Sequence, residues 1–108
     1  MSTAKIMKIV VFVPETHADL VRQTMGEAGA GKIGNYSYCT FSSKGFGRFK
    51  PMTGANPAIG EVGIPEAVPE EKIETVCAPE LVATVIAEIK RVHPYEEVAL
   101  EVYALENY

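Results

Sequence analysis

The chain has 108 residues, of which 47% are hydrophobic and 22% are charged, with a formal net charge of −4 at pH 7. This length suits a single domain over residues 1–108, and the composition excludes an intrinsically disordered chain. The acidic balance argues against a nucleic-acid-binding protein, because such proteins usually present a basic face. A local group of hydrogen-bond donors can still bind an anionic ligand.

The first apolar run and the cysteines bear on localisation. Residues 6–13 carry Lys8 and end at Pro14, so they are too short and too charged for a signal peptide or a membrane span. Cys39 and Cys77 stand far apart without a C-x-x-C pairing, which favours reduced thiols over a disulfide or a metal pair. We therefore expect a cytoplasmic protein with no membrane partner.

The first half of the chain predicts a strand, a helix and a second strand. Residues 5–13 are rich in β-branched side chains and predict a buried strand. Thr16 is expected to cap a helix over about residues 17–28, which the following glycines end. Residues 36–41 alternate as a second strand. Residues 43–68 hold five of the nine glycines and predict a long, turn-rich excursion.

The second half predicts a strand, a helix and a last strand. Residues 73–77 alternate as a third strand, and Pro79 suits the first turn of a second helix. Pro94 ends that helix at residues 92–93, and a last strand runs from residue 95 to about 105. This order predicts an α+β, ferredoxin-like βαββαβ sandwich of the PII/CutA type, with a Gly/Pro-rich excursion between the second and third core strands.

One face of such a sheet has no helix on it. Four aromatic side chains are expected on this face: Tyr36, Tyr38, Phe41 and Tyr103. An exposed apolar face of that size marks an interface. We therefore expect a homo-oligomer that assembles through it.

Two nucleotide-binding patterns occur among the first glycines. Residues 26–33 nearly fit the phosphate-loop pattern, with Ile33 in place of the required Ser or Thr, and residues 29–34 fit G-x-G-x-x-G. Both motifs need a strand before the loop and a helix after it, because the helix N-terminus binds the phosphate. Here the predicted order is helix and then strand, so we interpret the glycines as a helix stop.

The densest group of functional side chains is His93-Pro94-Tyr95-Glu96-Glu97. His93, Glu96 and Glu97 are candidate ligands of a divalent metal ion, although one chain supplies fewer groups than a zinc site needs, so that a second subunit would complete the set. The alternative is a structural corner between helix and strand, and it stays open. His17 is interpreted as a surface residue. No catalytic residue is predicted, because neither histidine has a nearby nucleophile in the sequence.

Residues 45–51 interleave two aromatic side chains with two cations. Arg48 and Lys50 can bind an anion, while Phe46 and Phe49 either stack on a ligand ring or anchor the loop to the open sheet face. Together with two tyrosines of the predicted second strand, they make up the candidate ligand-binding set: Tyr36, Tyr38, Phe46, Arg48, Phe49 and Lys50.

Several of these motifs occur in one known domain, in the same order: residues 29–36, 39–41, 45–51, Gly54, 57–60 and 93–97. The series resembles the PII-like domain inserted in bacterial Nif-three-like, dinuclear-metal-centre proteins of the YqfO type. That domain also occurs as a short stand-alone protein, which is the form expected here. The resemblance implies a fold similar to PII and CutA proteins, which commonly form trimers.

The resemblance implies less about activity. The metal-ligating residues of the long proteins lie in the two halves that flank this domain, so a hydrolase or cyclohydrolase label does not transfer. Residues 93–96 are similar to a motif of CutA, a family associated with divalent metal tolerance, but Glu97-Val98 stands where CutA tends to have proline. PII proteins bind nucleotides near a loop comparable to residues 43–68, yet no nucleotide-binding residue carries over.

These observations lead to one main hypothesis and two alternatives. The main hypothesis is a non-catalytic PII/CutA-like oligomer, with a trimer favoured, that binds a small molecule or a protein partner at clefts roofed by the excursion. The first alternative is a divalent-metal-binding protein. The second is an accessory form of a Nif-three-like metal-centre hydrolase, or a chain that is an enzyme by itself.

Overall fold

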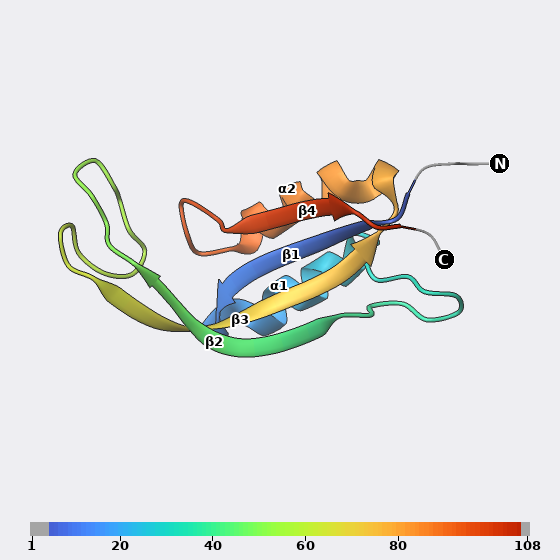
Figure 1. The fold of residues 1–108 in the computed structure, drawn as a ribbon, viewed down its shortest axis with the longest axis horizontal. Coiled ribbons are helices and arrows are strands. Elements are labelled where there is room, and N and C mark those ends of the chain that lie inside the picture. The colour runs from blue at the N-terminus through green and yellow to red at the C-terminus, as the bar shows by residue number, and fades with distance from the viewer. Residues whose placement is uncertain (1–4, 107–108) are drawn as a thin grey trace.

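A computed structural model describes residues 5–106 of the chain. Its elements are β1 (Met7–Pro14), α1 (Glu15–Glu27), β2 (Phe41–Phe49), β3 (Glu66–Cys77), the 3₁₀ turn η1 (Pro79–Leu81), α2 (Val82–Val92) and β4 (Leu100–Ala104) (Figure 1). The strands form one sheet in the order β2-β3-β1-β4, and every neighbouring pair is antiparallel. The predicted ferredoxin-like α+β fold is therefore confirmed.

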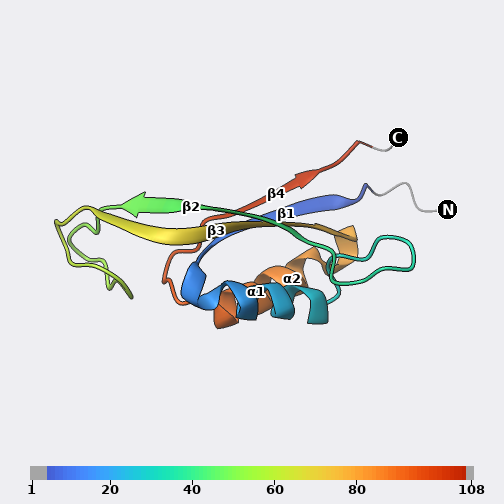
Figure 2. The ribbon, with the colours of Figure 1, turned by 90° about the horizontal axis from the view of Figure 1, so that it is seen from below.

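Both helices lie on the same face of the sheet (Figure 2). The core between these layers consists of strand residues of one parity and of the apolar stripes of the two helices. Ile9, Ile73, Val85 and Ile89 are all 0% exposed. Burying one such side chain contributes roughly 1.5–3 kcal/mol, so this layer provides the main stabilisation of the fold.

The start of α1 differs from the expectation. The helix begins at Glu15 directly after Pro14, which closes β1, and it has no side-chain cap. The Thr16 hydroxyl lies 2.9 Å from Nδ1 of His17 instead of capping the helix. The glycines after α1 do end it: Gly29 has a φ of +105° and donates its N–H to the Gly26 carbonyl. The interpretation of these glycines as a helix stop is confirmed.

The second strand was predicted too early. Residues 36–40 lie in a loop, and β2 begins at Phe41 and ends at Phe49. The cause is β3, which begins at Glu66 and not at residue 73, so that its additional residues pair with β2 as far as Phe49. This stretch contains glycines and charged residues, so it lacks the alternation of apolar and polar residues by which a strand is predicted. The excursion shrinks accordingly, from residues 43–68 to residues 50–65.

The last strand was also predicted too early. β4 begins at Leu100, and residues 93–99 form a loop after α2. In that loop the Tyr95 N–H donates to the His93 ring, at 3.1 Å, so local bonding takes the place of strand pairing there. Leu100 then pairs with Val11 and packs against the core.

Beyond the end of β1, β2 and β3 continue as a two-stranded ribbon (Figures 1 and 2). The pairing of β1 with β3 ends at Pro14 and Glu70, whereas the pairing of β2 with β3 continues to Glu66. Residues 50–65 connect the strands at this ribbon end, while residues 28–40 lie at the other end of the sheet (Figure 1). The molecule measures 52 × 24 × 22 Å as a result.

The sheet face opposite the helices, here called the free face, carries only part of the expected aromatic cluster. The strand register places Phe41 and Tyr103 on this face, with Val10 between their strands. Tyr36 and Tyr38 are not in the sheet, and Tyr38 lies against Gly26 of α1, so their expected place on the free face was wrong. Within residues 5–106, neither helix is long and apolar enough to cross a membrane.

Candidate ligand-binding pocket

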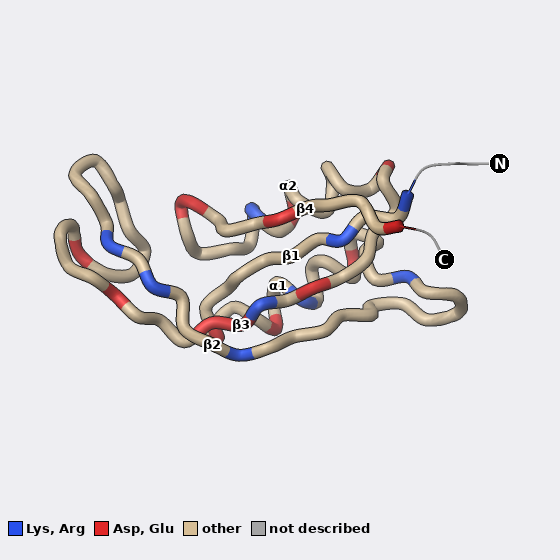
Figure 3. The backbone as a smooth tube through the Cα atoms, in the orientation of Figure 1, with Lys and Arg blue, Asp and Glu red and all other residues tan. Residues whose placement is uncertain are grey.

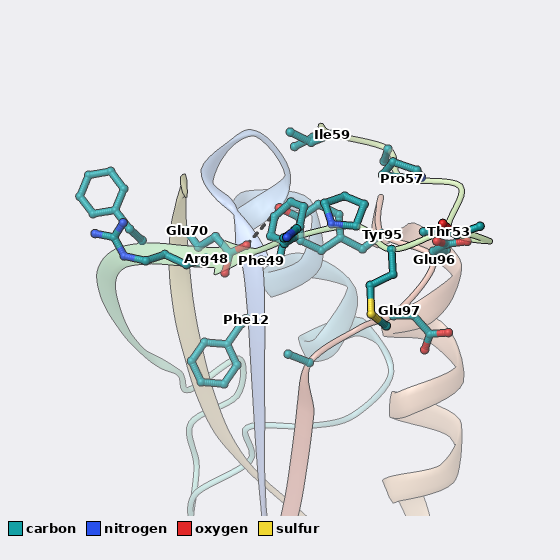
Figure 4. A pocket seen from close by; sticks show the side chains of 18 residues that line it. Phe12, Arg48, Phe49, Thr53, Pro57, Ile59, Glu70, Tyr95, Glu96 and Glu97 are labelled. Atoms are coloured by element: carbon teal, nitrogen blue, oxygen red, sulfur yellow. Dashed lines mark hydrogen bonds between the residues drawn. The ribbon is translucent and has the colours of Figure 1, made fainter. Parts of the chain in front are cut away.

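A pocket of about 690 Å³ lies at the ribbon end, between β2, the excursion and the loop after α2 (Figure 4). This volume is in the range of small-molecule sites, roughly 300–1,000 Å³. The residues that line it are Phe12, Phe46, Gly47, Arg48, Phe49, Lys50, Pro51, Met52, Thr53, Ala55, Pro57, Ala58, Ile59, Glu70, Tyr95, Glu96, Glu97 and Ala99.

The walls of the pocket are mainly apolar. The rings of Phe49 and Tyr95 meet edge to face, with centroids 5.8 Å apart and planes at 66°. Pro57 and Ile59 come from the excursion and face these rings across the pocket (Figure 4). Aromatic rings on one side and a proline-rich loop on the other can enclose the flat or apolar body of a ligand.

A buried carboxylate lies among these apolar groups. Glu70 of β3 is 8% exposed, and one of its oxygens, Oε2, accepts a hydrogen bond from the Tyr95 hydroxyl at 3.0 Å. Gly47 of the neighbouring strand leaves the room for this side chain, because a Cβ at position 47 would collide with the Glu70 carboxylate. Glu70 can therefore take this position only because residue 47 is a glycine.

Tyr95 is held as a hydrogen-bond donor. Burial raises the pKa of the Tyr95 hydroxyl well above its ordinary value of 10.0, and the hydrogen bond to Glu70 and the charge of Glu70 raise this pKa further. The phenol thus stays protonated through neutral and mildly alkaline pH. Its proton remains available for the hydrogen bond to Glu70.

The His93 ring holds the backbone of Tyr95 in place. Its Nδ1 accepts the Tyr95 N–H at 3.1 Å, so the ring proton belongs on Nε2, which donates to the Phe12 carbonyl at 2.8 Å. Burial lowers the pKa of His93 below its ordinary value of 6.5. A neutral imidazole with both nitrogens engaged has a positioning role, as in the predicted corner between helix and strand.

The candidate metal ligands do not converge within one chain. Both nitrogens of His93 are engaged, Glu96 accepts the Asn56 N–H at 2.8 Å, and Glu97 is exposed. In the described part of the chain, no group of three or more His, Cys, Asp or Glu side chains could hold a metal ion. The hydrogen bond from Asn56 to Glu96 instead joins the excursion to the loop after α2.

The candidate ligand-binding residues divide into two groups. Phe46, Arg48, Phe49 and Lys50 all line the pocket. The Arg48 guanidinium lies 5.9 Å from the centre of the Phe46 ring, and Figure 4 shows Arg48 extending away from the centre of the pocket. Tyr36 and Tyr38 lie in the loop at the opposite end of the sheet, so one chain does not bring them to this pocket.

Glu70, the most buried polar group of the pocket, and the role of Tyr95 in holding it do not follow from the sequence pattern. Position 70 lay outside the predicted third strand, so its face could not be assigned. The pairing of β3 with β2 beyond residue 73 places Glu70 opposite Gly45, and the Glu70 carboxylate extends from there to Gly47. Over the described chain, acidic and basic residues are interspersed (Figure 3).

The chain is similar in sequence and in structure to part of several longer proteins. No family model matches the chain. Over 106 residues it is 54% identical to the "GTP cyclohydrolase 1 type 2 homolog" of Halalkalibacterium halodurans, a match that covers 98% of this chain and 28% of that protein. It also superimposes on the crystal structure of a Bacillus cereus protein related to NIF3, with a TM-score of 0.85, 48% identity, and coverage of 99% of this chain and 27% of the other. Over nearly its whole length, the chain is therefore similar to one part of these longer, Nif-three-like proteins.

The chain spans about a quarter of the length of the curated relatives that it matches. CutA from Synechococcus elongatus has the same fold, with a TM-score of 0.68 at 16% identity over 97% of this chain and 80% of CutA. The predicted resemblance to the PII-like domain of Nif-three-like proteins is confirmed. At so low an identity, the likeness to CutA concerns the fold alone.

Proposed function

We propose that this chain is a non-catalytic binding module that takes a small organic molecule in the pocket at the ribbon end. The pocket itself carries the proposal: about 690 Å³ enclosed by aromatic and aliphatic side chains, with one buried carboxylate held by a tyrosine. Convergent polar groups in an apolar pocket are the usual mark of a small-molecule site. The cyclohydrolase name belongs to relatives of which the chain matches 28%, and the proposal does not carry it over.

The proposal includes no reaction. A hydrolytic site needs a nucleophile beside a free base, or a metal ion with an open position. In this pocket the nearest histidine, His93, has both ring nitrogens engaged in positioning Tyr95. The pocket therefore suits recognition. The free thiols of Cys39 and the buried Cys77 support a reducing, cytoplasmic place of action.

The proposal also includes a homo-oligomer, with a trimer as the favoured state. Phe41 is 68% and Tyr103 46% exposed, and both lie on the free face beside the buried Val10. Covering these rings would remove apolar surface from water. Analytical ultracentrifugation at micromolar concentration should give a trimer, and Phe41→Asp should dissociate it. A monomeric wild-type chain would contradict this part of the proposal.

Ligand binding is tested by an NMR screen of small organic fragments against the ¹⁵N-labelled chain. Fragments that bind should shift the amide signals of pocket residues, and Phe49→Ala should abolish these shifts. Tyr36→Ala is the control, because it also removes an aromatic side chain but lies outside the pocket, at the opposite end of the sheet and away from the free face. A screen in which no fragment shifts the pocket signals would overturn the proposed function.

The divalent-metal site around His93, Glu96 and Glu97 stays a prediction that requires ligands from a second protomer. Calorimetric titration with Zn²⁺ tests it. Stoichiometric heat that Glu97→Gln removes would favour a metal-binding protein over the proposed module. An absence of heat would leave the organic pocket as the site.

A further inference from the structure

We propose that the pocket selects an organic cation, an apolar or aromatic body that carries an ammonium group, and that Glu70 is its counter-ion. This inference rests on the proposed function, because it names the ligand class of the same pocket. The observation behind it is a buried carboxylate that accepts a single hydrogen bond from the described residues.

Glu70 is more than nine-tenths buried, and the protein satisfies only part of its carboxylate. Oε2 accepts the Tyr95 hydroxyl at 3.0 Å, and this is the one hydrogen bond that the described residues give to the group. An ionised carboxylate can accept several hydrogen bonds, and a buried charge without a partner is costly. The other oxygen, Oε1, lies beside Gly47, and both residues line the pocket, so a donor that enters the pocket can approach it there.

No cation of the described chain neutralises Glu70. None of the ion pairs in residues 5–106 includes it. Arg22 is engaged by Glu71 and Asp19 on the helix-covered side of the sheet. The Lys72 ammonium lies 6.0 Å from the centre of the Phe12 ring, and the Arg48 guanidinium stacks over a different ring. Lys44 and Lys72 line a smaller hollow beside Glu70 without forming an ion pair with it, so the carboxylate stays open to a cation from outside the chain.

The walls around Glu70 suit the body and the charge of such a ligand. Phe12, Phe49 and Tyr95 offer ring faces and edges, and an ammonium near an aromatic face gains a cation–π attraction. The exposed carboxylates of Glu96 and Glu97 are offset by the exposed cations Arg48 and Lys50, which also line the pocket. The buried Glu70 therefore decides the sign of the charge that the pocket favours.

An anionic ligand fits this arrangement poorly. Its charge would approach a buried carboxylate at low effective dielectric, where like charges repel strongly. The sequence pattern around Arg48 and Lys50 favours an anion. The buried acid gives the opposite preference.

Three probes of similar shape test the inference: 2-phenylethylammonium, 2-phenylethanol and 3-phenylpropanoate. Their dissociation constants are measured by NMR titration of the ¹⁵N-labelled chain, with pocket amides as reporters. The ammonium should bind at least about tenfold more tightly than the alcohol, because it adds a charge-assisted hydrogen bond to Glu70. The carboxylate should bind most weakly.

Variants assign the preference to Glu70. Glu70→Gln preserves the shape of the side chain and should weaken ammonium binding by about tenfold while changing alcohol binding less than twofold. Glu74→Gln is the matched control on the same strand and face, outside the pocket, and should change neither. Should Glu70→Gln fail to fold, the ranking of the three probes on the wild-type chain decides by itself.

The possible failures are distinguishable. The cation preference would be overturned if the probes shift the pocket amide signals but the alcohol binds as tightly as the ammonium, or the carboxylate binds more tightly. The proposed function would stand in either case. An ammonium preference that survives in a folded Glu70→Gln would remove Glu70 as the counter-ion. If neither the probes nor any library fragment shifts the amide signals of the pocket, both proposals are overturned.

Discussion

The helix-covered half of the sheet and its ribbon end differ in what fills the space beside the strands. In the covered half, strand residues such as Ile9 and Ile73 pack against helix residues such as Ile89, and all three are fully buried. At the ribbon end, a loop replaces the helices, glycines replace β-branched residues, and Phe46 is 65% exposed. The first region encloses a core, whereas the second encloses a pocket.

This difference indicates how stability and recognition are divided in the chain. A core without voids gains free energy from each buried group, so substitutions there are costly. The ribbon end gives up such packing and buries one carboxylate beside a tyrosine. The structure therefore tolerates an unfavourable charge at one end because the other end provides the stability.

The largest effect is expected from a substitution in the core of the helix-covered half. Ile89→Ala should lower the free energy of unfolding by roughly 2–5 kcal/mol, because it removes a fully buried side chain of α2 and leaves a cavity. The control is Ile64→Ala in the excursion, where the side chain is 49% exposed and the change should stay within about 0.5 kcal/mol. Urea unfolding measures both, and equal effects would contradict the division proposed here.

A smaller effect is expected from filling the gap in the ribbon. Gly47→Ala should destabilise the chain by about 1–3 kcal/mol and reduce ligand binding, since the new methyl group collides with the Glu70 carboxylate. Gly45→Ala is a matched control in the same strand, with open space where its Cβ would lie. It should leave stability unchanged or raise it slightly. If both variants behaved alike, the fit between Gly47 and Glu70 would not matter.

The next effect in size is expected from removing the Tyr95 hydroxyl, which donates to the buried Glu70 carboxylate. Tyr95→Phe leaves the buried Glu70 without its donor and should cost about 1–3 kcal/mol in the free energy of unfolding. Tyr103→Phe, on the free face, should cost less, because that side chain is 46% exposed. Thermal unfolding monitored by circular dichroism compares the two variants.

The same tyrosine predicts an alkaline dependence of stability. The pKa of Tyr95 is raised in the folded chain, so the stabilisation is complete below pH 10.0 and is lost as the pH rises above that value. Wild type should therefore lose more stability than Tyr95→Phe between pH 9 and pH 11. Parallel losses would indicate that the hydroxyl is not buried as described.

The smallest effect is expected from His93. Its pKa is lowered by burial, so unfolding takes up a proton and stability falls as the pH drops below 6.5 toward the lower folded-state value. One proton corresponds to a slope of about 1.4 kcal/mol per pH unit at most. Urea unfolding of wild type and of His93→Gln across this range measures it, and identical slopes would contradict the assignment.

The elements that the sequence predicted well are those with an uninterrupted local pattern. β1 is a continuous run rich in β-branched residues, and α2 repeats apolar residues at helical spacing, so the local pattern determines the place and type of both elements. β2 and the start of β3 were misplaced because Gly45, Gly47 and the acidic run at residues 70–71 have no apolar alternation. What determines these strands is pairing with each other, a long-range property that a local pattern does not contain.

The site was predictable to a similar degree. Phe49 and Lys50 were recognised because aromatic residues and cations between glycines are unusual, and Tyr95 lies in a dense polar cluster. Glu70 looked like an ordinary surface glutamate. Its burial depends on Gly47, two residues along β2 from the residue that pairs with Glu70, and only the three-dimensional structure shows that relation.

His93 connects the pocket to a helix end. It is the C-cap residue of α2, and its backbone N–H donates to the Ile89 carbonyl at 2.9 Å while its ring holds Tyr95. Fraying of the last turn of α2 and loosening of Tyr95 are therefore linked equilibria. A bound molecule that fixes Tyr95 slows amide hydrogen exchange in a helix that it does not touch, and this helix end thereby reports occupancy.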